Sequence, residues 1–144
     1  MLKGLASLSL SLVFLSSGTI VLAAESGYVA RSNLMQNIRS EFSVLARMAQ
    51  EKIQFDESLA ESTRLTLLNL AASAPTIFED NELPINSEAL PAIWENWEDF
   101  VEKADDFAFM IEGLETSSAD TLAAGLGNIG QSCGSCHTAY RIKK

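Results

Sequence analysis

The chain has 144 residues, of which 47% are hydrophobic, and its formal net charge is −9. This length suits one domain with one core, and the apolar content excludes a disordered chain. An acidic surface repels nucleic acids and anionic membranes, so we expect neither as a partner.

The N-terminal segment has the pattern of a secretory signal peptide. A basic start at Lys3 precedes a long apolar run, which ends in small residues suited to cleavage after Ala23. A retained membrane anchor is the alternative, but Ser and Gly at 16–18 interrupt the run. We therefore expect residues 1–23 to be removed, leaving a mature domain over 24–144. Lys3 is the only charged residue removed, so the mature net charge is −10.

Two helices are predicted in the first half of the mature chain. The first covers about 28–52 and the second about 57–73, because apolar residues recur at intervals of three and four. Pro75 follows the second helix and disfavours its continuation. Residues 75–88 are predicted to form a long connection.

Two more helices are predicted in the second half. The third starts near Ser87 or Leu90, with Pro91 in its first turn, and ends near Gly113. The fourth starts at a capping box made by Ser117 and Asp120 and runs to about residue 141. No segment alternates with period two, so we predict an all-α fold, an antiparallel four-helix bundle.

The fourth helix carries a motif for covalent haem attachment. Cys133-Gly-Ser-Cys136-His137 is Cys-x-x-Cys-His, the pattern that binds haem c. On a helix the three functional side chains share one face, so two thiols can add to the porphyrin vinyl groups while the imidazole points at the iron. We therefore predict one haem c, covalently bound via Cys133 and Cys136, with His137 as an axial ligand.

Three other interpretations of the two cysteines are weaker. A thioredoxin-type pair needs its first Cys at a helix N-terminus, and this pair lies near a C-terminus. A zinc site would need distant carboxylates, because the chain has no other Cys or His. A plain disulfide, the usual expectation in an exported protein, explains neither His137 nor the glycines around the motif.

Four glycines in the fourth helix also fit a haem. Each costs roughly 1 kcal/mol relative to Ala inside a helix, a loss that close approach of a flat macrocycle would offset. Tight packing between helices is the alternative explanation. The glycines are Gly125, Gly127, Gly130 and Gly134.

The residues alone do not identify the sixth ligand of the iron. His137 is the only histidine, so the iron cannot have two His ligands. The remaining choices are Met, Lys, water or no ligand. Met35, Met48 and Met110 are the methionines of the mature chain.

The sequence resembles the cytochrome c′ family, the class II c-type cytochromes. The resemblance extends from Arg31 to Lys144 and rests on three pieces. The first is the haem motif close to the C-terminus, followed by Tyr140-Arg141. The second is Leu90-Pro-Ala-Ile-Trp94 with Phe100 after it, and the third is Arg31 with Met35 one turn later.

The resemblance implies a haem near one end of the bundle, with His137 as proximal ligand and Met35 on the distal side. It places Arg31 near the haem propionates, Phe78 against the haem and Arg141 near His137 and the exposed haem edge. Arg31 as a solvated surface residue and Met35 as core are the alternatives. It further implies a periplasmic protein that forms a homodimer through its first two helices.

Two functions are compatible with these residues, and both include electron transfer in the broad sense. In the first, Met35 crowds a five-coordinate iron that binds nitric oxide or carbon monoxide; the sequence leans slightly towards this reading. In the second, Met35 is the sixth ligand of a low-spin electron carrier. We expect no enzymatic activity, because no general base lies near the motif in sequence. Neither the physiological ligand nor the redox partner protein follows from the sequence.

Overall fold

A computed structural model describes residues 26–143. The predicted signal peptide, 1–23, lies outside the described residues. Four long helices form the fold: α1 (Gly27–Ala49), α2 (Glu57–Ala72), α5 (Trp97–Glu112) and α6 (Ala119–Tyr140). Two short helices, α3 (Ala74–Phe78) and α4 (Ala92–Glu95), lie between α2 and α5. The all-α bundle predicted from the sequence is therefore confirmed.

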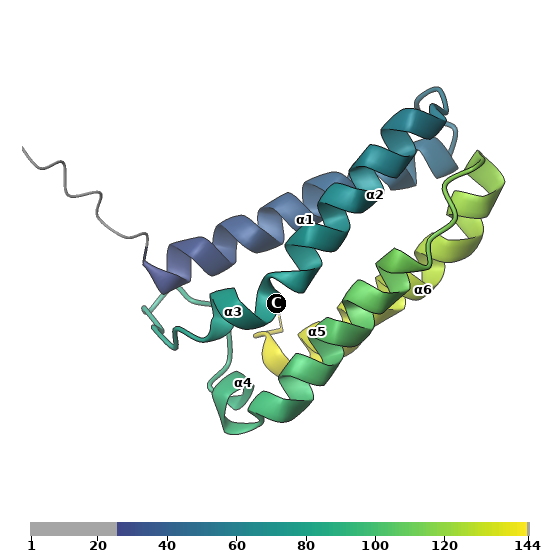
Figure 1. Ribbon diagram of the computed structural model, residues 1–144. Coiled ribbons are helices and arrows are strands. Elements are labelled where there is room, and N and C mark those ends of the chain that lie inside the picture. Colours follow the sequence, from purple (N-terminus) through teal and green to yellow (C-terminus); the bar gives the residue numbers. More distant parts are fainter. Residues whose placement is uncertain (1–25, 144) are drawn as a thin grey trace, which may run out of the picture.

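The four long helices form two antiparallel layers (Figure 1). One layer holds α1 and α2, the other holds α5 and α6, and contacts join α1 to α6 and α2 to α5 across the interface. The N-terminal end of α1 and the C-terminal end of α6 lie at the same end of the bundle, together with α3 and α4 (Figure 1). We call this the α3–α4 end.

Side-chain caps explain where three of the long helices begin. The Ser26 side chain accepts a bond from the backbone N–H of Val29 at 3.4 Å, and the Asp56 side chain accepts one from Leu59 at 2.9 Å. The capping box of α6 is made by Ser118 and Thr121, one residue later than predicted. Each of their side chains accepts a bond from the other residue's backbone N–H.

The region between α2 and α5 differs most from the prediction. The expected long connection contains α3, and the expected third helix is divided into α4 and α5 by Asn96, whose backbone leaves the helical region at φ −126° and ψ 50°. Pro91 caps α4 at its N-terminus.

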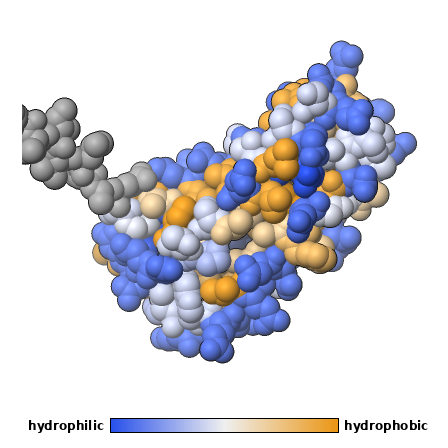
Figure 2. Space-filling view, in the orientation of Figure 1, coloured by the Kyte–Doolittle hydropathy of each residue, from blue (hydrophilic) through white to orange (hydrophobic). Residues whose placement is uncertain are grey.

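The core runs the length of the bundle along the line where the layers meet. All four long helices contribute side chains that are fully buried, including Leu45, Leu67, Ile111 and Leu122. Figure 2 shows apolar surface along the same line on the face in view, with hydrophilic residues around it. Within 26–143, no helix is both long enough and apolar enough to cross a membrane.

An ion pair closes the end of the bundle opposite α3 and α4. Arg64 bonds Glu61 at 2.6 and 2.8 Å and the backbone oxygen of Glu112 at 3.1 Å, while Thr116 donates to Glu61 at 2.9 Å. These bonds tie α2 to the end of α5 and the loop that follows. The bonds from Arg64 and Thr116 lower the pKa of Glu61 to about 2.

Because the pKa of Glu61 is lowered, we expect the protein to lose a small part of its folding free energy in acid. A lowered folded-state pKa stabilises the fold above the unfolded pKa of about 4.3. That contribution disappears as the pH falls towards 2. Because the Glu61 side chain is 42% exposed, we expect Glu61→Gln to cost only about 0.5–1 kcal/mol at pH 7. Urea unfolding at pH 7 and pH 2.5 should show this difference shrinking, and a constant difference would contradict the assignment.

Candidate functional site

The haem motif lies in the last two turns of α6. Cys133 and Cys136 are partly buried and His137 is exposed, so the motif lies at the border between the bundle interior and solvent. Both cysteines are free thiols. Their position near the C-terminus of a helix is the reverse of the thioredoxin arrangement. Among the described residues, no three His, Cys, Asp or Glu side chains gather into a metal site.

The two thiols and the imidazole of the motif are uncharged at neutral pH in this structure. Burial raises the pKa of both thiols, so they are protonated at neutral pH. Desolvation of the imidazole by the atoms around it, and then the charge of Arg141, lower the pKa of His137. The imidazole is therefore neutral, which is the form that binds iron.

The face of α6 that carries His137 has open space for a flat group. A Cβ built on Gly127, Gly130 or Gly134 would meet no atom within 4 Å. These glycines lie 10, 7 and 3 residues before His137, so they share its side of the helix. Gly125 differs, because its Cβ would lie 2.4 Å from a methyl carbon of Leu114. Contact with Leu114 thus accounts for Gly125, whereas the other three glycines are exposed and leave room on this face of α6.

The end of α6 is held by the chain that leads into α4. The backbone N–H of Leu90 donates to the backbone oxygen of Tyr140 at 3.0 Å, and that of Ile142 donates to the backbone oxygen of Glu88 at 2.8 Å. Arg141 pairs with the Glu88 carboxylate at 2.5 Å. A surface hollow beside them is lined by Gly134, His137, Thr138, Arg141, Ile142 and Lys143, which brings Arg141 and His137 together as the resemblance implied.

Arg31 is a buried residue, and the alternative of a solvated surface position is wrong. Its side chain is 4% exposed, and its guanidinium donates to the backbone oxygens of Asp80 and Glu82. The guanidinium carbon lies 5.7 Å from the ring centre of Phe78 and 5.4 Å from that of Trp94. Burial lowers the pKa of Arg31, while Asp80 and Glu82 oppose this effect.

A glycine allows this arrangement. A Cβ on Gly27 would lie 2.2 Å from the carboxyl carbon of Asp80, so any larger residue would have to displace the Asp80 side chain. Arg31 follows one turn later on the same side of α1.

Phe78 belongs to an aromatic cluster that reaches α6. It is buried, and its ring centre lies 5.0 Å from that of Phe100. The ring centre of Phe100 in turn lies 5.4 Å from that of Trp97 and 5.6 Å from that of Tyr140. The indole of Trp94 donates to the Phe78 backbone oxygen at 2.7 Å. The cluster therefore joins α3, α4 and α5 to the turn of α6 that follows His137.

Sequence reasoning did not identify Asp99 as a site residue. The hydroxyl of buried Tyr140 donates to the Asp99 carboxylate. Burial, and then the Asp99 carboxylate, raise the pKa of Tyr140 to about 12, so the phenol remains a donor at neutral pH. The two residues are 41 apart in sequence, and no local pattern could have paired them.

The methionines lie at different ends of the bundle. Met48 is in the last turn of α1 and Met110 in the last turn of α5, both at the end opposite α3 and α4. His137 is at the α3–α4 end, and α6 is about 33 Å long at 1.5 Å per residue. Met35 lies in the first half of α1, half-buried against the core. Of these three, only Met35 lies towards the His137 end.

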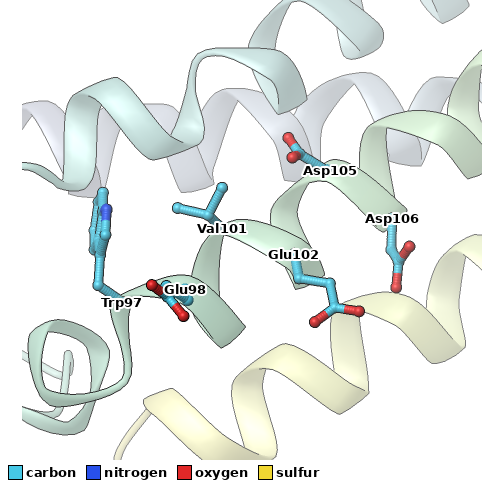
Figure 3. Close-up of a pocket in the computed structure, with 6 residues that line it drawn as sticks. All are labelled: Trp97, Glu98, Val101, Glu102, Asp105 and Asp106. Carbon is cyan, nitrogen blue, oxygen red and sulfur yellow. The ribbon is translucent and has the colours of Figure 1, made fainter.

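A second hollow lies on α5 and is strongly acidic. Figure 3 shows Trp97 and Val101 pointing from α5 towards the layer of α1 and α2, with carboxylates beside them. The carboxylates belong to Glu98, Glu102, Asp105 and Asp106. None of the sequence-predicted site residues lines this hollow.

A family model described as Cytochrome C′ matches residues 28–141, a range that includes the haem motif, Arg31, Met35, Phe78 and Arg141. The chain belongs to the cytochrome c′ family. This membership and the Cys133–Cys136 pair agree with one covalently attached haem c, as predicted.

Individual relatives agree with the family match. Cytochrome c-556 of Agrobacterium fabrum is 30% identical, over 90% of this chain and 89% of its own length. Cytochrome c-554 of Cereibacter sphaeroides is 35% identical, over 78% of each chain. A solved cytochrome c′ from Rhodobacter sphaeroides superposes with a TM-score of 0.72 at 26% identity, covering 82% of this chain and 96% of that one.

Proposed function

We propose that this protein is an exported electron carrier that cycles one haem c between its ferric and ferrous states, with His137 as the proximal iron ligand. The observation that supports this most is the exposed face of α6, where His137 follows the two thiols and three glycines leave space. When bound, the haem supplies the redox-active iron. An exposed proximal side leaves a short path for an electron to a partner.

The residues of the chain hold the haem in different ways in this proposal. Cys133 and Cys136 anchor it, and His137 binds the iron in its neutral form. Phe78 packs against it, and Arg31 has further N–H donors for a propionate beyond the two that bond Asp80 and Glu82. Arg141 places a positive charge beside the exposed edge.

We infer that Met35 is the sixth ligand, so we prefer the low-spin form over the five-coordinate form that the sequence slightly favoured. Of the methionines described, only Met35 lies in the half of its helix towards His137, and its partial burial already restricts its thioether. His with Met is an established electron-transfer ligand pair. With both ligands fixed, the iron rearranges little when its charge changes.

Gas binding at a five-coordinate iron is the second candidate function. A cytochrome c′ variant from Alcaligenes xylosoxidans, solved as its nitric oxide complex, superposes on this chain with a TM-score of 0.72 at 25% identity. In this version Met35 crowds the distal side without bonding iron, and nitric oxide or carbon monoxide enters.

The ferrous absorbance spectrum with and without carbon monoxide separates the two candidates. We expect the wild type to show a sharp low-spin α band that carbon monoxide leaves unchanged. Met35→Ala should give a broad high-spin spectrum that shifts with the gas. Met110→Ala is the control, because Met110 is 43% exposed at the far end of the bundle. A wild-type spectrum that shifts with carbon monoxide, and that Met35→Ala leaves unchanged, would favour the second candidate.

We further propose cleavage after Ala23, residence in the periplasm and a homodimer through α1 and α2. Apolar side chains exposed on this layer support the dimer, among them Leu59 and Leu65, which are 46% and 45% exposed. N-terminal sequencing of the exported protein tests the cleavage site. The molecular mass of the native protein in solution tests the dimer.

A further inference from the structure

An ion pair on α5 lies beside the part of α6 that carries the haem motif. The Lys103 ammonium donates to the Asp99 carboxylate at 3.0 Å, one helical turn away. The same carboxylate accepts the Tyr140 hydroxyl bond, so Asp99 is fixed from two sides. Both residues are separate from the predicted iron ligands.

Helix spacing places the pair beside Cys136. Asp99 accepts a bond from the Tyr140 hydroxyl, and Tyr140 lies four residues after Cys136, on the same face of α6. Cys136 packs against the buried core. Cys136 is one of the two haem anchors, and the pair therefore lies on the side of α6 where this thiol would hold the haem.

We propose that the Asp99–Lys103 pair tunes the reduction potential of the haem in opposite directions, with the carboxylate lowering it and the ammonium raising it. This inference rests on the proposed electron-transfer function. Ferric haem carries one more positive charge than ferrous haem, so a nearby carboxylate stabilises the ferric form and a nearby ammonium destabilises it. Charges and hydrogen bonds outside the iron ligands adjust haem potentials in this manner.

The exposure of the pair determines how large the effect is. The Asp99 side chain is 51% exposed and that of Lys103 is 29% exposed, so water screens both charges. The shifts should therefore be modest, and they should shrink as the salt concentration rises.

Tyr140 gives Asp99 a second role as a positioning residue. By accepting the Tyr140 hydroxyl bond, Asp99 holds the turn of α6 that follows His137 against α5. Asp99→Asn keeps an acceptor oxygen for this bond while it removes the charge. Tyr140→Phe does the reverse, because it removes the bond and keeps both charges.

The test is a spectroelectrochemical titration of the haem-loaded protein and its variants. We expect Asp99→Asn to raise the midpoint potential, Lys103→Gln to lower it, and the double variant to return close to the wild-type value. Glu112→Gln is the control, since it removes an equal charge at the opposite end of α5. Tyr140→Phe should lower the free energy of unfolding without raising the potential.

Several outcomes would overturn the inference. It is wrong if Asp99→Asn and Lys103→Gln shift the potential in the same direction, or by no more than Glu112→Gln does. The same holds if Tyr140→Phe raises the potential as much as Asp99→Asn, because positioning would then account for the effect. A wild-type protein without a reversible one-electron couple would overturn the proposed function and this inference together.

Discussion

The double variant Cys133→Ala, Cys136→Ala is expected to lose all covalently held haem. Each thiol of the wild type adds across one vinyl group, so removing both leaves no bond that survives denaturation. Each single variant should keep one thioether and thus remain coloured after denaturation. The contrast between the single and double variants separates attachment through two thiols from non-covalent binding.

A denaturing gel stained for haem measures this result directly. Ser132→Ala is a suitable control, because it changes the neighbouring residue of the same helix and leaves both thiols in place. Haem that stays with the double variant would contradict attachment at these cysteines. A wild type that loses its haem on the gel would contradict covalent attachment altogether.

Arg31→Ala should be the most destabilising substitution at the α3–α4 end. It leaves the backbone oxygens of Asp80 and Glu82 without their donor and removes the group that lies between Phe78 and Trp94. Losing these part-buried hydrogen bonds and leaving a cavity together cost about 2–4 kcal/mol. Urea unfolding of the haem-loaded protein measures this loss.

Arg39→Ala is the matched control for this prediction. Arg39 lies on the same helix but is exposed, so its removal should change stability by less than about 0.5 kcal/mol. Arg31→Met keeps most of the side-chain volume but not the donors. Equal losses for the two Ala variants would show that Arg31 does not tie α1 to this loop, and full stability of Arg31→Met would assign its role to packing alone.

The sequence predicted most of the fold because the signals involved are local. Three-and-four spacing located α1, α2 and α6 to within a few residues, and it located the end of α5 but not its start at Trp97. The haem motif was recognised from five consecutive residues, which needs no knowledge of the fold. The break at Asn96 was missed because the apolar pattern continues across it from Trp94 to Phe100. The cap of α6 was placed at Ser117 instead of Ser118 because adjacent serines fit the same pattern.

The site contacts that the sequence missed are long-range. Arg31 bonds residues about 50 positions away, and Tyr140 bonds Asp99, 41 positions away. Such pairs depend on which helices are neighbours and on how each is rotated. The resemblance gave Arg31 a position near the haem, but only the packing of α1 against the loop after α3 gives its guanidinium the backbone oxygens of Asp80 and Glu82 as partners.

The central claim is that one haem is thioether-linked to the last helix, and the intact mass of the exported protein under denaturing conditions tests it most directly. Addition of two thiols across two vinyl groups loses no atoms, so we predict the mass of residues 24–144 plus the whole mass of one haem. A mass that is two hydrogen atoms below that of the reduced polypeptide would reveal a disulfide between Cys133 and Cys136 and contradict the account.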